Sequence, residues 1–300
     1  MKIDVAPGRY VLAVSGGVDS MTLLDLLAHM PQVEIVVAHF DHGIRPDSAQ
    51  DRELVQKAAE QYGLEYIYEE GQLGSAASEN VARKARYDFL RRAQGSTGAT
   101  AIVTAHHQDD VIETIMLNLM RGTNRRGLSS LRSTEEIIRP LLGYTKNELQ
   151  QYAVERGITW REDSTNADMR YKRNYIRQQL VPRLSPADRQ ELLRIATGMR
   201  AINDELDSVL VQTFQAISDK NGHLVRKKFI MLPYAVSIEV LAMYLRRSDV
   251  RNLSKRTLSR LVVALKTARP HTTYDVDVNL ILVISTSTAY LTQRPSHKKS

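Results

Sequence analysis

Residues 10–20 read YVLAVSGGVDS, and this stretch decides the fold. Its first part, residues 10–14, is a continuous apolar run, which is typical of a strand buried on both faces of a parallel sheet. A Ser-Gly-Gly turn closes the strand, and leucines at helical spacing over residues 21–30 predict a helix that Pro31 stops. A strand, a glycine turn and a helix in this order predict the first unit of an α/β sheet.

The alternation of strand and helix continues through the first half of the chain. It predicts an α/β fold of the Rossmann-like type, a doubly wound parallel sheet with right-handed crossovers. Ligands of such sheets bind beyond the carboxyl ends of the strands, where Ser15, His39 and His106 are expected. The expected strands are residues 34–40, 65–68 and 101–105, and the expected helices are residues 47–62 and 79–94.

The second half of the chain has a different pattern. Pro182 and Pro186 mark a joint, after which residues 187–218 predict one long helix. Residues 274–292 are rich in Val, Ile and Thr and predict two or three strands, preceded by helices over 234–247 and 255–266. We therefore expect a sheet domain over residues 1–185, a helical connector over 186–218 and a small basic α+β domain over 219–300.

Composition excludes several classes of protein. A chain of 300 residues is long enough for two domains, and 43% hydrophobic residues suffice for a buried core. No apolar run reaches the roughly 20 residues that span a bilayer, and the first residues lack the apolar region of a signal peptide. We therefore expect a cytoplasmic protein that binds no membrane. The absence of cysteine excludes disulfides, zinc fingers, iron–sulfur clusters and thiol catalysis.

The charge is distributed unevenly along the chain. Residues 1–219 contain 26 Lys and Arg against 30 Asp and Glu, whereas residues 220–300 contain 15 against 4. A basic unit of this kind predicts a polyanionic partner, and nucleic acid is the commonest one. The alternative is a solvated basic face without a partner.

The SGGVDS motif lies where the first strand meets the first helix. Backbone N–H groups and a helix N-terminus can converge on a phosphate there, and two glycines let it approach closely. The Walker pattern GxxxxGK[ST] is absent, and an ordinary turn in which Asp19 suits the helix dipole is the alternative. The candidate phosphate-binding residues are Ser15, Gly16, Gly17, Val18, Asp19 and Ser20.

Polar residues also follow the second expected strand. Residues 39–45 read HFDHGIR and place two histidines, an aspartate and an arginine on one loop. A His-x-x-His spacing with an aspartate could hold zinc. Contacts with a substrate are favoured over a metal site, because loop histidines are more often hydrogen-bonded or exposed.

The densest polar group is AHHQDDVIET, residues 105–114, where a helix begins after a strand. Asp110 and Glu113 share one helix face at i, i+3, as do His106 and Asp110 at i, i+4, and they form an acidic pocket suited to an amine or a metal. The alternative is a capping cluster in which Glu113 faces solvent. The metalloprotease pattern HExxH is absent.

Basic residues recur in other segments. SENVARKARY, residues 78–87, places Arg83 and Arg86 on one helix face, where they are either solvated or bound to phosphate. RGTNRRGLSSLR, residues 121–132, is either a mobile polar loop or an RNA contact.

A last polar segment joins the only tryptophan to a basic helix turn. WREDSTN at residues 160–166 is followed by YKRNYIRQQL at residues 171–180. Arg173 and Arg177 are one turn apart in this segment, next to Asn174.

The order and spacing of these motifs resemble one family over residues 10–180. SGGVDS, HFDHGIR, NVARKARY, AHHQDDVIET, NLMRG, RPLL and WREDSTNADMRYKRNYIR together are similar to the tRNA(Ile)-lysidine synthases, a branch of the PP-loop N-type ATP pyrophosphatases. Residues 121–127 depart from the family in being strongly basic, and the C-terminal part is short, with a resemblance that rests on layout.

The resemblance implies an enzyme, an ATP-dependent ligase that forms a C–N bond. ATP adenylates the C2 oxygen of the wobble cytidine, position 34, of a CAU-anticodon tRNA(Ile), and diphosphate leaves. The ε-amine of L-lysine then attacks C2 and AMP leaves, so that lysidine changes decoding from AUG to AUA. ATP and Mg²⁺ are the implied cofactors, and the tRNA and L-lysine are the implied partners.

The resemblance also implies roles for individual residues. The SGGVDS loop holds the phosphates of ATP, and Asp110 and Glu113 bind lysine. Either of these two carboxylates could accept the lysine proton, and the Mg²⁺ ligands and the oligomeric state stay open, a homodimer included. The implied catalytic residues are Asp19, His106, Asp110 and Glu113, and those implied to contact RNA or the nucleotide are Arg83, Arg86, Arg173, Asn174 and Arg177.

Two other functions are weighed against this one. A PP-loop enzyme that amidates a small metabolite needs ammonia, usually from a glutaminase domain, and would leave the basic residues 219–300 unexplained. A catalytically inactive RNA-binding protein would not need the intact SGGVDS and DDVIET motifs. Sulfur insertion, the chemistry of related tRNA-modifying enzymes with paired cysteines, is excluded because the chain has none.

Overall fold

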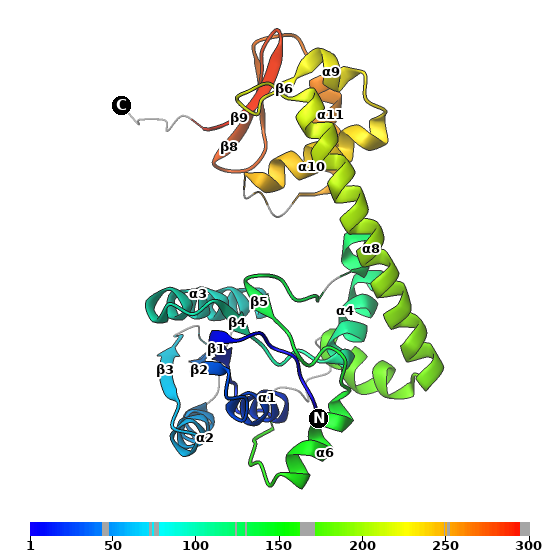
Figure 1. Cartoon of the computed structure of the whole chain (residues 1–300). Helices are drawn as coiled ribbons and strands as arrows, with labels where there is room; N and C mark the ends of the chain where they lie inside the picture. Colours follow the sequence, from blue (N-terminus) through cyan, green and yellow to red (C-terminus); the bar gives the residue numbers. More distant parts are fainter. Residues whose placement is uncertain are drawn as a thin grey trace. The chain divides into compact units, whose positions relative to one another are not determined.

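The structure is a computed structural model that describes residues 1–43, 48–71, 74, 78–123, 125–129, 131–162, 172–248, 250 and 253–294. The chain divides into two compact units, Met1–Arg200 and Ala201–Ser300 (Figure 1). The boundary between them falls within a long helix, α8 (Pro186–Ile217). Across the described ranges, no helix is both long and apolar enough to cross a membrane.

A five-stranded parallel sheet forms the centre of the first unit. Its spatial order is β3-β2-β1-β4-β5, and every neighbouring pair is parallel. The central strand is therefore β1, and the winding of the chain changes direction between β1 and β4, where ligands of such sheets bind. The strands are β1 (Gly8–Ala13), β2 (Val33–Asp41), β3 (Glu65–Glu70), β4 (Ala101–Val103) and β5 (Ile137–Ile138).

Helices cover both faces of this sheet (Figure 1). Helices α1 (Val18–Ala28) and α2 (Ser48–Gln61) pack on one face, and α3 (Glu79–Thr97) packs on the other. Successive side chains of β2 enter the two cores in turn, Val37 on the α1 side and Val36 on the α3 side. A strand buried on both faces must be apolar throughout, which explains the unbroken runs in the sequence.

The rest of the first unit carries the polar segments. Helix α4 (Gln108–Met120) follows β4, and α5 (Arg125–Leu128) precedes β5. Helix α6 (Lys146–Glu155) packs on α1 and begins with a capping box, in which Thr145 and Glu148 satisfy each other's backbone N–H groups. Helix α7 (Lys172–Tyr175), a π-helical turn (Ile176–Leu180) and a 3₁₀ turn (Val181–Arg183) lead into α8.

The second unit is built around an antiparallel sheet of order β6-β9-β8-β7. Its own apolar core includes Phe229, Leu241, Leu265 and Leu282. The strands are β6 (Leu224–Val225), β7 (Thr272–Asp275), β8 (Leu280–Ile284) and β9 (Thr288–Gln293), and the helices are α9 (Arg226–Ile230), α10 (Tyr234–Arg247) and α11 (Lys255–Thr267).

The predicted fold class is confirmed, a doubly wound parallel sheet followed by a long helix and a small α+β region. Residues 274–292 contribute to three strands, the higher of the two expected numbers. Strand β5 was not predicted, because two residues leave no periodic pattern. Residues 44–47 and 163–171, which belong to the HFDHGIR and WREDSTN segments, lie outside the described residues, as do Asn124 and Ser130.

A buried carboxylate ties α1 to α6. Asp25 of α1 is 3% exposed, and its oxygens accept hydrogen bonds from the hydroxyls of Tyr62 (2.7 Å) and Tyr152 (2.6 Å) and from the guanidinium of Arg156 (3.3 Å). Burial alone would raise the pKa of Asp25, but these hydrogen bonds outweigh it and hold the pKa below its usual value. The carboxylate therefore stays ionised and joins α1 to the segments that carry its three donors.

Replacement of Asp25 by Ala is expected to lower the free energy of unfolding by about 2 kcal/mol at pH 7, because three donors lose one shared acceptor. Urea unfolding measures this difference, and Glu53→Ala on the exposed face of α2 is the matched control, expected to change it by less than about 0.5 kcal/mol. Because the pKa of Asp25 is lower in the folded than in the unfolded chain, its ionisation stabilises the fold above pH ~4, and this contribution is lost as the pH falls. An effect of Asp25→Ala that is undiminished at acid pH would contradict this linkage.

Candidate active site

The glycine turn after β1 has the geometry of an anion-binding loop. Gly16 has a φ of +87°, a left-handed conformation that L side chains rarely adopt. The hydroxyl of Ser20 closes the turn, since it donates to the carbonyl of Gly17 (2.9 Å) and accepts from the backbone N–H of Ser15 (3.1 Å). Helix α1 has no side-chain cap, so the N–H groups of its first turn are available to an anion.

A cavity of about 380 Å³, here the first cavity, lies at the carboxyl ends of the strands. Its walls combine Ser15, Gly17, Asp19 and Ser20 after β1 with residues at the end of β2 and residues 104–106 after β4. Side chains from three strand ends that are distant in the sequence therefore meet around one space. Val18 does not line this cavity; its side chain is buried at the start of α1.

The first turn of α4 directs acidic side chains inward. His107 is the N-cap residue, and its backbone N–H donates to Oδ2 of Asp110 (3.0 Å). Asp110 and Glu113 are both buried, and Glu113 is only 2% exposed. The alternative of a capping cluster is thus half right, because Asp110 does cap the helix but Glu113 does not face solvent.

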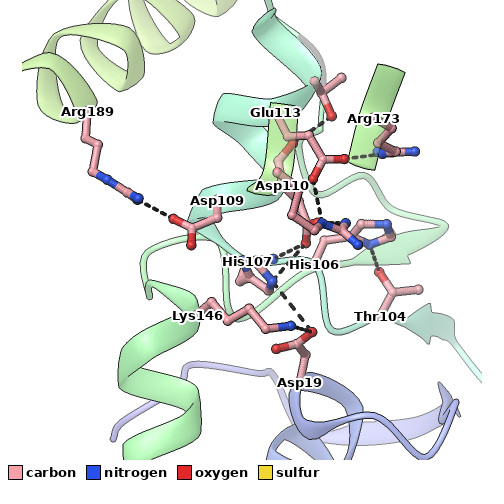
Figure 2. Close-up of polar contacts among 12 residues, drawn as sticks. Asp19, Thr104, His106, His107, Asp109, Asp110, Glu113, Lys146, Arg173 and Arg189 are labelled. Atoms are coloured by element: carbon pink, nitrogen blue, oxygen red, sulfur yellow. Dashed lines mark hydrogen bonds and ion pairs between the residues drawn. The ribbon is translucent and has the colours of Figure 1, made fainter. Parts of the chain in front are cut away.

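A chain of charged groups joins the glycine turn to α4 (Figure 2). Nζ of Lys146 lies 3.3 Å from Oδ2 of Asp19, and Nε2 of His107 lies 3.6 Å from the same oxygen. Nε2 of His107 is also 3.5 Å from Oδ2 of Asp110. Three separate segments, α1, the start of α4 and the start of α6, supply this chain.

The charges in this chain favour one another's ionised forms. Burial opposes the ionisation of Asp19, but the hydrogen bond and charge of His107 and the charge of Lys146 outweigh it and lower the pKa of Asp19. Burial likewise opposes the protonation of His107, yet Asp19 and Asp110 on either side raise the pKa of His107. His107 therefore favours the imidazolium form more than an ordinary histidine does.

His106 behaves in the opposite way to its neighbour. It lines the first cavity, and its Nδ1 lies 2.8 Å from the hydroxyl of Thr104. Burial is the main cause that lowers the pKa of His106 to about 3, with the arginines Arg139 and Arg86 acting in the same direction against Asp110. His106 is accordingly neutral at pH 7, and the pKa values of the two adjacent histidines are shifted in opposite directions.

Two arginines surround Glu113. Nε of Arg173 donates to Oε1 of Glu113, and Nε of Arg177 donates to Oε2 at 2.9 Å (Figure 2 labels the first pair). Nη2 of Arg177 also donates to Oδ1 of Asp110 at 3.4 Å. The structure thus brings together the acidic pair and the arginine pair that the sequence singled out, with Asn174 next to Arg173 in α7.

A second cavity of about 690 Å³ lies on the other side of this chain of charges. His107, Glu113, Lys146 and Arg177 line it, together with Asp109, whose carboxylate pairs with Arg189 of α8. Asp19 and Asp110 line the first cavity. Asp19 contacts His107 and Lys146, and Asp110 contacts His107, so residues of the two cavities touch one another. These four residues form a wall between the cavities, which we call the shared wall: Asp19, His107, Asp110 and Lys146.

The two arginines predicted on α3 occupy different positions. Both lie against the ring of Tyr87, with guanidinium carbons 4.8 Å (Arg83) and 5.5 Å (Arg86) from the ring centroid. Arg86 lines the first cavity, whereas Arg83 does not. Of the two arginines that the sequence predicts on one helix face, Arg86 therefore lies at the cavity beside the glycine turn and Arg83 does not.

Three residues of the site were not assigned from the sequence: His107, Lys146 and Arg161. Nε of Arg161 donates to the buried Asp51 (2.7 Å), and its backbone N–H donates to the carbonyl of Gly16 (3.0 Å), beside the first cavity. The contact of Lys146 with Asp19 spans 127 positions in the sequence. No local pattern marks such a contact, because TKNE at residues 145–148 indicates only the start of a helix.

The region of residues 39–43 gives no support to a zinc site. His39 is buried, with Nδ1 2.8 Å from the carbonyl of Val14, and Asp41 accepts a hydrogen bond from the backbone N–H of Gly43 (2.8 Å). In the part of the chain that the structure describes, no group of three or more His, Asp or Glu side chains is arranged to hold a metal ion. The first cavity is nevertheless lined by His39 and Asp41.

Comparison with known proteins identifies relatives of this site. Residues 2–184 match the model of the PP-loop domain family. A curated tRNA(Ile)-lysidine synthase of Thermotoga sp. (strain RQ2) is 34% identical over 268 residues, which cover 85% of this chain and 62% of the relative. A protein of the same name from Thermus thermophilus is 43% identical over 196 residues, 62% of this chain and 38% of the relative. The chain thus spans less than two thirds of the length of these relatives.

A solved structure shares the fold. The U34-tRNA thiolase of Methanococcus maripaludis, solved with its [4Fe-4S] cluster, superimposes with a TM-score of 0.55 over 66% of this chain and 73% of the thiolase chain. The sequences are 18% identical, so the similarity concerns the fold alone.

The contact between Glu113 and Arg173 is expected to be strongly coupled, because Glu113 is buried and cannot exchange its partner for water. A double-mutant cycle with Glu113→Gln and Arg173→Gln should give a coupling of about 1–3 kcal/mol in the free energy of urea unfolding. The exposed pair of Lys84 and Asp88, 2.6 Å apart, is the control and should show almost no coupling. Equal coupling in the two cycles would show that burial does not strengthen the Glu113 contact.

Proposed function

The chain belongs to the PP-loop family, and on that premise we propose that it ligates L-lysine to C2 of the wobble cytidine, position 34, of a CAU-anticodon tRNA(Ile), using ATP. The product is lysidine, which changes decoding from AUG to AUA. One observation carries the proposal: the buried acidic pair Asp110 and Glu113 lies beside a phosphate-binding turn in a chain without cysteine. Relatives named for this activity support it.

In the first step, the C2 oxygen of the cytidine attacks the α-phosphorus of ATP and diphosphate leaves. The backbone of the Ser15–Ser20 turn binds the phosphates: Gly17 lines the first cavity and lets a phosphate approach closely, while Gly16, which faces Asp51 and Val55, supplies the left-handed bend of the turn. Asp19 stays ionised and fixed between Lys146 and His107, so the turn keeps one arrangement during the reaction. Neutral His106 lines the first cavity without adding a charge.

Mg²⁺ enters this scheme as part of the substrate, the Mg²⁺ complex of ATP. Phosphate oxygens and water supply most ligands of Mg²⁺ in such complexes, and the ion offsets charge on the leaving diphosphate.

In the second step, the ε-amine of lysine attacks C2 and AMP leaves. Asp110 and Glu113 supply the negative charge that attracts an ammonium group, and the second cavity, lined by Glu113, is large enough for an amino acid side chain. Arg173 and Arg177 now occupy the carboxylates, so lysine must compete with them. Contacts of these arginines and of Asn174 with RNA phosphate would free the acidic pair for lysine.

The second unit supplies the charge for binding RNA. Residues 220–300 hold 15 Lys and Arg against 4 Asp and Glu, and exposed cations such as Lys255 and Arg256 begin α11. We assign catalysis to residues 1–185, connection to residues 186–218 and tRNA binding to residues 219–300, in a cytoplasmic enzyme. Arg83 and Arg86 of the first unit add basic charge near the first cavity.

Lysine incorporation tests the activity directly. With ATP and Mg²⁺, labelled L-lysine should enter a CAU-anticodon tRNA(Ile) transcript but not the elongator methionine tRNA. Asp19→Ala should slow diphosphate release by at least about 100-fold, because it removes the anchor of the phosphate turn. Glu113→Gln should leave diphosphate release near the wild-type rate and slow lysine transfer by about 100-fold.

Each failure of this assay has a distinct meaning. Diphosphate release without lysine incorporation would point to another nucleophile, as in an enzyme that amidates a metabolite. Tight tRNA binding with neither step would point to an inactive RNA-binding protein. Equal loss of both steps in Glu113→Gln would refute the assignment of Glu113 to lysine binding.

The basic unit is tested by a pair of charge-matched variants. Lys255→Gln with Arg256→Gln should weaken tRNA binding and make its salt dependence shallower by about 0.9 per lost phosphate contact. Lys2→Gln with Lys57→Gln, in the first unit, removes the same charge and should change binding much less. Filter-binding titrations at several salt concentrations measure both, and equal losses in the two variants would refute the role of the basic unit.

A further inference from the structure

The charged neighbours of His107 indicate which of its nitrogens carries a proton. Nε2 faces Oδ2 of Asp19 at 3.6 Å and Oδ2 of Asp110 at 3.5 Å, and both carboxylates can only accept. Nε2 must therefore carry a hydrogen. In the neutral imidazole, Nδ1 is then the atom with the free lone pair.

That lone pair receives no hydrogen bond from the part of the chain that the structure describes, although the side chain of His107 faces the backbone N–H of Asp110 in the capping arrangement of α4. His107 is 4% exposed, and Nδ1 is buried without a hydrogen-bond partner among the described residues. A buried acceptor without a donor costs about 1–3 kcal/mol, so a working complex that supplies the donor is favoured. The ring lines the second cavity together with Glu113 and Arg177, where the proposed function places the lysine ammonium.

The neighbouring carboxylates are poorer proton acceptors than this nitrogen. In the structure both oxygens of Glu113 are bound by arginines, and in the proposed complex the lysine ammonium takes the place of these arginines, so the carboxylate stays paired with a cation. Asp110 accepts from the backbone N–H of His107 in either case. Hydrogen bonds from cations stabilise the ionised carboxylate and reduce its tendency to take a proton. His106 is also unsuitable, because its Nδ1 is already 2.8 Å from the Thr104 hydroxyl and its surroundings disfavour a positive charge.

We propose that His107 is the proton acceptor for the amine nucleophile, acting through Nδ1. The proposal rests on the proposed function and adds a catalytic residue to it. Asp19 and Asp110 hold the ring through Nε2, so that the same two carboxylates orient the base and stabilise the imidazolium it becomes.

One proton of the ammonium moves to Nδ1 of His107, and the freed lone pair forms the C–N bond at C2 of the adenylated cytidine. The C2–O bond breaks, and its electron pair leaves with AMP. The AMP phosphate, which gains a negative charge, takes the second proton from the new C–N linkage, and His107 later returns its proton to water.

The surroundings of His107 fit this timing. Asp19 from α1 and Asp110 from its own helix raise the pKa of His107, while Lys146 from α6 opposes them and burial opposes them most. An ammonium that enters beside Asp110 and Glu113 adds positive charge and drives the proton off His107. The base is therefore made neutral by the arrival of its own substrate.

Single-turnover lysine transfer to pre-adenylated tRNA isolates the step, with the full-length wild type and His107→Gln compared. Diphosphate release should be near the wild-type rate in the variant, and lysine transfer should be slower by at least about 100-fold. An aminooxy analogue of lysine, which is largely unprotonated at pH 7, needs no base and should restore transfer in His107→Gln to near the wild-type rate. A loss of packing alone would not be rescued in this way.

The pH dependence gives a second readout. In the wild type, lysine transfer should rise with pH through the ionisation of His107 and then level off, because His107 supplies the base. In His107→Gln it should keep rising toward the pKa of free lysine, ~10.4. His29→Gln, a histidine at the far end of α1, is the matched control and should behave as the wild type does.

The outcomes separate the two proposals. If the wild type transfers no lysine, the proposed function fails. If the wild type transfers lysine and His107→Gln does so at the same rate and with the same pH profile, the role of His107 fails. If His107→Gln does not fold, the pH profiles of the wild type with lysine and with the aminooxy analogue test the proposal. Identical profiles would overturn the role of His107. A pH dependence that levels off only with lysine would support it.

Discussion

The site depends on β1 being the central strand of a parallel sheet. Parallel pairing places the carboxyl ends of β2 and β4 on either side of the turn that follows β1. Residues distant in the sequence, such as Asp19 and His107, can then lie 3.6 Å from each other. Without this register, the glycine turn would have no acidic neighbour, and neither cavity would have its shared wall.

Burial of charge imposes the second constraint. Asp19, Asp110 and Glu113 contribute three carboxylates, and Lys146, Arg173 and Arg177 contribute three cations. Unpaired ions would be costly at these positions, which explains why each carboxylate contacts at least one cation. Since these six charges cancel, the proton on His107 sets the net charge of the cluster.

The sequence predicted the fold well because its signals are local. Apolar runs, the SGGVDS turn and the proline after α1 each depend on neighbouring residues, and so do the spacings that place Asp110 and Glu113 on one helix face. The partners of these residues could not be predicted, because a contact such as Lys146 with Asp19 is made by tertiary packing of α6 on α1. The same limit applied to His107, since two adjacent histidines have equal sequence signals and acquire opposite pKa shifts only from their surroundings.

The shared wall has a thermodynamic consequence. Asp19 lines the first cavity and contacts His107, which lines the second cavity. An anion bound in the first cavity adds negative charge beside this pair and therefore stabilises the protonated form of His107. Binding is thus coupled to proton uptake from the buffer. The enthalpy of anion binding therefore contains the ionisation enthalpy of the buffer, and the apparent affinity at one cavity varies with pH through a residue that lines the other.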